Sequence, residues 1–210
     1  YQVKIAEFEN LRLRINSLII DGNNLFLGTS LGLLQTNIES EDLKTIESGF
    51  QNVENTGTNN QTSGTIISLK KSKDESIWVV KNNTVSKIII QPGSNKAYLI
   101  DTVLIDGVTF RNITEDIYGN LWFLALENGL FKYDTKNKLY EHFTTDNSSH
   151  SISSNNCSSI VSGKNGNLWI STLDKGLNLL RSDQLNKINP HFEYFQNDPL
   201  NMKSINSNLI

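Results

Sequence analysis

The sequence predicts an all-β protein made of β-propeller blades, because of a long repeat, its turns and its asparagine content. Trp78, Trp122 and Trp169 stand 44 and 47 residues apart, each in a short apolar cluster, and Phe26 takes the same place 52 residues before Trp78. Asparagine, which tolerates left-handed turns, accounts for 28 of the 210 residues. A four-stranded antiparallel unit of this period is typical of a propeller blade. A solenoid of parallel strands is the competing architecture, but hairpin turns argue against it.

Each copy of the repeat opens with a strand and a tight turn. An aliphatic residue precedes the aromatic one by eight or nine positions, and these residues are Leu18, Leu69, Ile113 and Ile160. Turn residues follow, namely 21–23, 73–75, 116–119 and 163–166. Asp-Gly-Asn at 21–23 is a hairpin signal, whereas Lys-Asp-Glu at 73–75 lacks a glycine and is the weakest match.

The rest of each copy predicts three more strands. The aromatic residue lies in the second strand and should fill the layer between blades, where an aromatic ring buries a large area. A second turn then leads to a Gly-Leu pair in three copies, at Gly32, Gly129 and Gly176, and to Thr84-Val85 in the copy around Trp78. A third strand follows, and then a more variable fourth strand such as 140–143.

These strands predict four complete blades, over 14–50, 65–101, 109–143 and 157–195. Residues 1–8 are expected to be the last strand of a preceding blade, and 204–210 the start of a following one. We therefore interpret 1–210 as part of a larger propeller of about seven blades. Such a part exposes two apolar blade faces, which favours self-association. The asparagine-rich stretch 52–60 is expected to be an exposed loop.

Composition excludes several classes of function. The net charge of −3 does not suit nucleic-acid binding, and no apolar run approaches the roughly 20 residues of a transmembrane helix. A single cysteine, Cys157, excludes an intramolecular disulfide, and we expect it to be a small buried thiol.

The repeat resembles that of the two-component regulator propellers, most clearly at Ile160, at Gly-Asn-Leu-Trp-Ile-Ser-Thr over 166–172 and at Gly176-Leu177. The stretch 191–208 is similar to the linker that precedes such repeats. The resemblance implies the periplasmic sensor region of a bacterial hybrid two-component sensor histidine kinase. In that family the kinase and the membrane helix lie in other parts of the protein, and many members sense oligosaccharides and regulate polysaccharide utilisation.

No residue pattern predicts catalysis, a metal site or a cofactor. The histidines His142, His150 and His191 lack a metal-ligand spacing, and acidic residues near the turns, such as Asp116, are expected to initiate those turns. The tryptophans are expected to be core residues rather than sugar platforms. Propellers usually bind ligands at one face through loops, so we expect ligand contacts from polar loop residues: Asn83, Glu127, Asn128, His150, Asp174 and Lys175.

Three functions follow from these observations. The first is extracytoplasmic sensing by binding of an oligosaccharide, linked to a change in packing between domains or protomers. The second is a propeller lyase or glycosidase, which requires convergent acids, histidines or tyrosines. The third is a scaffold that binds other proteins and no small ligand.

Overall fold

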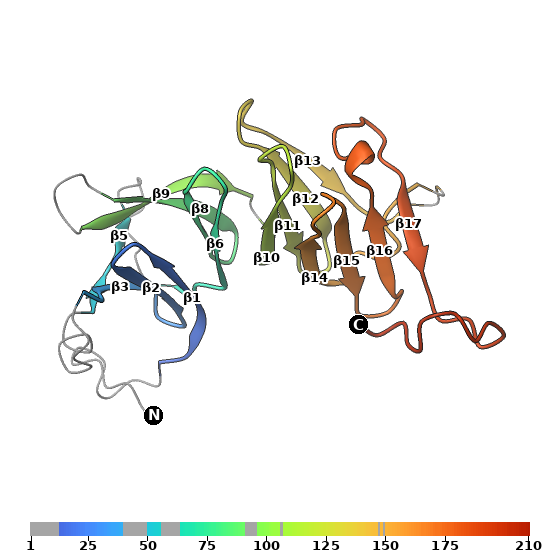
Figure 1. Ribbon diagram of the computed structural model, residues 1–210, viewed down its shortest axis with the longest axis horizontal. Coiled ribbons are helices and arrows are strands. Elements are labelled where there is room, and N and C mark those ends of the chain that lie inside the picture. Colours follow the sequence, from blue (N-terminus) through green and yellow to red (C-terminus); the bar gives the residue numbers. More distant parts are fainter. Residues whose placement is uncertain are drawn as a thin grey trace. The chain divides into compact units, whose positions relative to one another are not determined.

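The computed structural model describes residues 13–39, 50–55, 64–90, 96–105, 107–146, 148 and 150–210. The flank expected at 1–8 lies outside these residues. The chain divides into two compact units, Tyr1–Gly107 and Val108–Ile210, and each contains two β-sheets (Figure 1). The described residues include no helix long and apolar enough to cross a membrane.

The first unit contains one four-stranded and one five-stranded sheet. The first sheet has the order β1-β2-β3-β4, formed by Ile15–Asp21, Asn24–Thr29, Leu33–Asn37 and Gln51–Asn52. The second has the order β5-β9-β8-β7-β6. Its strands are β5 (Glu54–Asn55), β6 (Ser68–Lys71), β7 (Ile77–Val80), β8 (Thr84–Ile90) and β9 (Ala97–Leu104).

The second unit contains two four-stranded antiparallel sheets. The order of one is β10-β11-β12-β13, formed by Phe110–Glu115, Leu121–Ala125, Gly129–Asp134 and Leu139–Phe143. The order of the other is β14-β15-β16-β17, formed by Cys157–Ser162, Leu168–Thr172, Leu177–Leu180 and Phe192–Phe195. A short 3₁₀ helix, η2 (Ser182–Gln184), lies between β16 and β17.

The all-β class and the four-stranded antiparallel blade are thus confirmed, with one correction in the first unit. We expected the stretch 52–60 to be an exposed loop, but residues 52–55 are not part of one. Val53 is 2% exposed and its N–H donates to the Leu33 carbonyl at 2.9 Å. The flanking residues form β4 and β5, and β5 adds a parallel strand to β9. Val53 is therefore buried between two short strands, of which β4 pairs with β3 at the edge of one sheet and β5 pairs with β9 at the edge of the other.

The first turn keeps its backbone shape in three of the four blades, even where glycine is missing. Gly119 and Gly166 adopt φ values of 85° and 77°, and Glu75 adopts 65° at the corresponding place. The β1–β2 turn is shorter, because Asp21 pairs directly with Asn24. Left-handed backbone at a residue with a side chain costs about 1–2 kcal/mol. The weak copy of the repeat therefore forms the same turn at a greater conformational cost.

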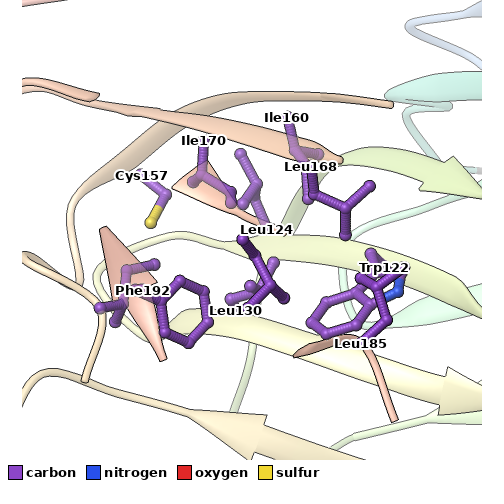
Figure 2. Packing of buried hydrophobic residues seen from close by; sticks show 11 residues of the cluster. Trp122, Leu124, Leu130, Cys157, Ile160, Leu168, Ile170, Leu185 and Phe192 are labelled. Atoms are coloured by element: carbon purple, nitrogen blue, oxygen red, sulfur yellow. The ribbon is translucent and has the colours of Figure 1, made fainter. Parts of the chain in front are cut away.

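The core of the second unit lies between its two sheets (Figure 2). Trp122, Leu124 and Leu130 come from one sheet, and Ile160, Leu168, Ile170 and Phe192 from the other. Side chains alternate between the two faces of a strand, so Leu168 and Ile170 face this core while Trp169 lies on the opposite face. Of the residues at the aromatic repeat position, Phe26, Trp78 and Trp122 are buried and Trp169 is half-buried.

Residues 204–210 contain no strand, but they repeat the contacts of the connection between β13 and β14. The N–H of Gly129 donates to the carbonyl of Asn155, and the N–H of Gly176 donates to the carbonyl of Asn208. Ser151 and Ser204 likewise hydrogen-bond to the backbone of Asp146 and Asp198. The sequence similarity between these two segments therefore corresponds to a shared local structure.

Candidate functional site

A pocket of about 690 Å³ opens in the second unit beside β13. Three segments line it: the end of β13 at 141–143, the connection 144–152 and the stretch 188–192 before β17. The antiparallel sheets fix the first segment and Phe192 at the end of the third, and the connection crosses between them. The pocket is therefore built from parts of both sheets of this unit.

The floor of the pocket is apolar and continuous with the core. Ile152 and Phe192 are 0% and 1% exposed. Phe143 contacts Phe192 edge to face at a centroid distance of 6.0 Å and stacks on Trp122 at 5.5 Å. Because these rings belong to the packed core, the floor is rigid.

His142 is held in one orientation at the side of the pocket. Its ring stacks on Phe131 at 3.9 Å, and its Nε2 lies 2.7 Å from the Asn128 carbonyl oxygen. A carbonyl oxygen only accepts, so Nε2 carries a proton and donates it. Because His142 is the cross-strand partner of Phe131, its ring lies on the face of this sheet opposite to Phe143.

Hydrogen bonds between residues of the connection 144–152 fix its conformation. The Asp146 carboxylate accepts from the Ser148 N–H at 2.7 Å, and the Ser151 hydroxyl accepts from the Asp146 N–H at 3.2 Å. The hydrogen bonds from Ser148 hold the pKa of Asp146 below its usual value. Asp146 is therefore negatively charged at neutral pH.

His150 and Tyr194 connect this segment to β17. The His150 carbonyl accepts from the Phe192 N–H at 3.3 Å, and the Tyr194 hydroxyl donates to the Ser151 carbonyl. The His150 ring lies 4.9 Å from that of His191. Across the described ranges, no three His, Cys, Asp or Glu side chains lie close enough together to hold a metal ion.

Glu141 at the rim is paired with a buried cation. Lys132 is 5% exposed, and its Nζ donates to Glu141 Oε1 at 3.1 Å and to the Leu185 carbonyl at 2.7 Å. The same ammonium lies 5.7 Å from the Trp122 ring. Lys132 therefore joins the two sheets and offsets the charge of Glu141.

The loop residues expected to bind ligand do not all converge. His150 lines the pocket, while Asn128 holds His142 through its carbonyl. Glu127, Asp174 and Lys175 lie in the β11–β12 and β15–β16 turns, and Asn83 belongs to the first unit. Their role in binding stays a prediction. Asp146, at the start of the same polar loop as His150, also lines the pocket. Glu141 and Asn189 line it too, although no local sequence signal marks them.

Cys157 is buried as expected, at 3% exposure, and its thiol donates to the Ser154 carbonyl at 3.4 Å. Burial, with a smaller contribution from Asp174, raises its pKa to about 12. We expect modification by a thiol reagent at pH 8 to be about a hundredfold slower in the native chain than in urea, because the thiolate is the reactive form. Equal rates would contradict the buried position.

The four-stranded sheets and their repeated turns define the chain as a β-propeller protein. Residues 151–174 match the family model described as two component regulator propeller. The resemblance drawn from the sequence is therefore confirmed over these residues. No curated protein matches the sequence significantly.

Solved structures support the same fold. The extracellular domain of a protein classed as a hybrid two-component system from B. thetaiotaomicron matches with a TM-score of 0.65 and 21% identity, over 93% of this chain and 24% of that one. A second such domain from this organism matches with a TM-score of 0.55 and 17% identity, over 93% and 23%. Virginiamycin B lyase from Staphylococcus aureus matches with a TM-score of 0.60 and 12% identity, over 90% and 60%. These identities establish the fold alone, and the chain spans about a quarter of the hybrid-system domains.

Proposed function

We propose that this chain belongs to the extracytoplasmic sensor propeller of a hybrid two-component protein and that it takes part in binding oligosaccharides. The observation that carries the proposal is the two-component regulator propeller repeat at 151–174. The similarity to extracellular domains of hybrid two-component systems supports it. In this proposal the kinase and the membrane anchor belong to other parts of the parent protein, which lies in the inner membrane with this region in the periplasm. Ligand binding controls genes for polysaccharide utilisation.

Calorimetric titration of the chain with defined oligosaccharides tests the binding function. We expect saturable binding of at least one glycan, without any change in the glycan itself. Chromatography of the sugar after incubation provides the second measurement. Cleavage of the glycan would instead favour the lyase or glycosidase alternative. Absence of binding to any glycan, together with capture of a defined protein domain, would favour the scaffold.

We also propose that open blade faces drive self-association. Val161 is 55% exposed beside its cross-strand partner Trp169, and Phe195, whose ring lies 5.6 Å from that of Trp169, is 39% exposed. Trp122, at the equivalent repeat position, is fully buried. Apolar area of this kind associates when a matching surface is available.

Light scattering at increasing protein concentration tests this association. We expect the chain to form dimers or larger assemblies, and we expect Trp169→Glu to shift it toward the monomer because a carboxylate would be buried in the contact. Asn165→Glu, in the exposed β14–β15 turn, is the matched control and should associate like the wild type. A monomer at all concentrations would contradict the proposal.

A further inference from the structure

The pocket beside β13 has the size and the mixed surface of a ligand site. Its volume of about 690 Å³ falls within the roughly 300–1,000 Å³ typical of small-molecule pockets. The half-buried Phe143 supplies the accessible apolar surface, the fully buried Ile152 and Phe192 lie beneath it, and polar side chains stand around it. A sugar ring presents C–H groups on its faces and hydroxyl groups at its edges. The floor suits such a face, and the polar walls suit the hydroxyl groups.

The polar walls offer both donors and acceptors. The exposed side-chain amide of Asn189 makes no hydrogen bond within the part of the chain that the structure describes, and it can both donate and accept. Asp146 adds a carboxylate oriented by the Ser148 N–H. Hydroxyl groups, which also donate and accept, complement this set.

The charge of the pocket favours neutral sugars over acidic ones. Glu141 and Asp146 are acidic, and no lysine or arginine occurs among the described residues that line the pocket. The nearby Lys132 ammonium is engaged by Glu141 and by the Leu185 carbonyl. Carboxylate and sulfate groups are usually bound by arginine or lysine. An acidic sugar would therefore meet like charge without a cationic partner.

We propose that this pocket is a binding subsite for uncharged sugar units of an oligosaccharide. The inference rests on the proposed sensing function, and it adds the position of the site and its preference for neutral over acidic glycans.

Calorimetric titration of the whole 210-residue chain tests the inference with cellotetraose, xylotetraose and maltotetraose as neutral probes and tetragalacturonate as the acidic probe. We expect binding of at least one neutral probe, and binding of tetragalacturonate at least about tenfold weaker. The double variant His150→Ala/Asn189→Ala should weaken neutral binding at least about tenfold. Both side chains are exposed, and the His150 carbonyl contact to Phe192 survives the change.

Asn165→Ala is the matched control, because Asn165 is exposed in the same unit and lies outside the pocket lining. It should bind as the wild type does. Equal affinity of wild type and double variant for a bound glycan would overturn the assignment of the pocket and leave the sensing function intact. Tighter binding of tetragalacturonate would overturn the preference for uncharged sugars. Failure of the wild type to bind any probe would count against the sensing function and the subsite together.

Discussion

Replacing Trp122 by alanine is expected to lower the free energy of unfolding of the second unit by about 3–5 kcal/mol, the usual loss for a buried tryptophan. The side chain is fully buried in the core between the two sheets (Figure 2). It also stacks on Phe143. Its Nε1–H also donates to Asp116 at 2.9 Å. The substitution therefore leaves a cavity and removes one donor from a carboxylate that is itself 0% exposed.

Urea denaturation followed by circular dichroism measures this loss, and two further variants separate its causes. Trp122→Phe keeps most of the apolar area but loses the N–H, so we expect about 1–3 kcal/mol from the weakened Asp116 network. Trp169→Ala is the repeat-equivalent control. At low protein concentration, where association does not contribute, we expect about 1–2 kcal/mol because Trp169 is only half-buried. Equal losses at Trp122 and Trp169 would show that the inter-sheet core does not depend on this position.

Replacing Gly129 by alanine is expected to destabilise the second unit by about 2–4 kcal/mol, a value typical of combined backbone strain and steric overlap. Gly129 has a φ of 73°, and an added Cβ would lie 2.4 Å from the Phe143 carbonyl oxygen. The Gly129 N–H also donates to the Asn155 carbonyl at 3.1 Å. Relief of the overlap would therefore displace β13 or the connection to β14.

Gly119→Ala isolates the backbone contribution to this loss. Gly119 has a φ of 85°, and its added Cβ would meet only the Glu115 carboxylate at 3.8 Å. We expect about 1–2 kcal/mol from left-handed backbone alone. The same urea titration compares the two variants, and a Gly129→Ala variant no less stable than Gly119→Ala would refute the predicted steric overlap.

The blade repeat could be predicted because its signals are local. The spacing of Trp78, Trp122 and Trp169, together with turns such as 163–166, is visible in one sequence since each hairpin closes within a few residues. Edge strands are less predictable. Val53 lies in a polar stretch, and nothing in the sequence around it indicates that its backbone pairs with Leu33.

The pocket could not be predicted from the sequence. His142, His150 and Asn189 are separated by up to 47 positions, and they line one cavity only because the two sheets of this unit pack together. The expectation that polar loop residues contact ligand identified His150. It also selected Asp174 and Lys175, which lie in a turn outside the described lining. Local polarity identifies loop residues, whereas convergence depends on contacts that are distant in sequence.

The sequence by itself determined the period of the repeat, the turns and the residues available for the core, because these depend on neighbours in the chain. The tertiary structure alone decided which residues at equivalent positions are buried. Trp122 is fully buried against a second sheet, whereas Trp169 lies on a sheet face that no described segment covers to the same extent. Burial is a property of the surface that packs against a residue, and a repeated motif does not specify that surface.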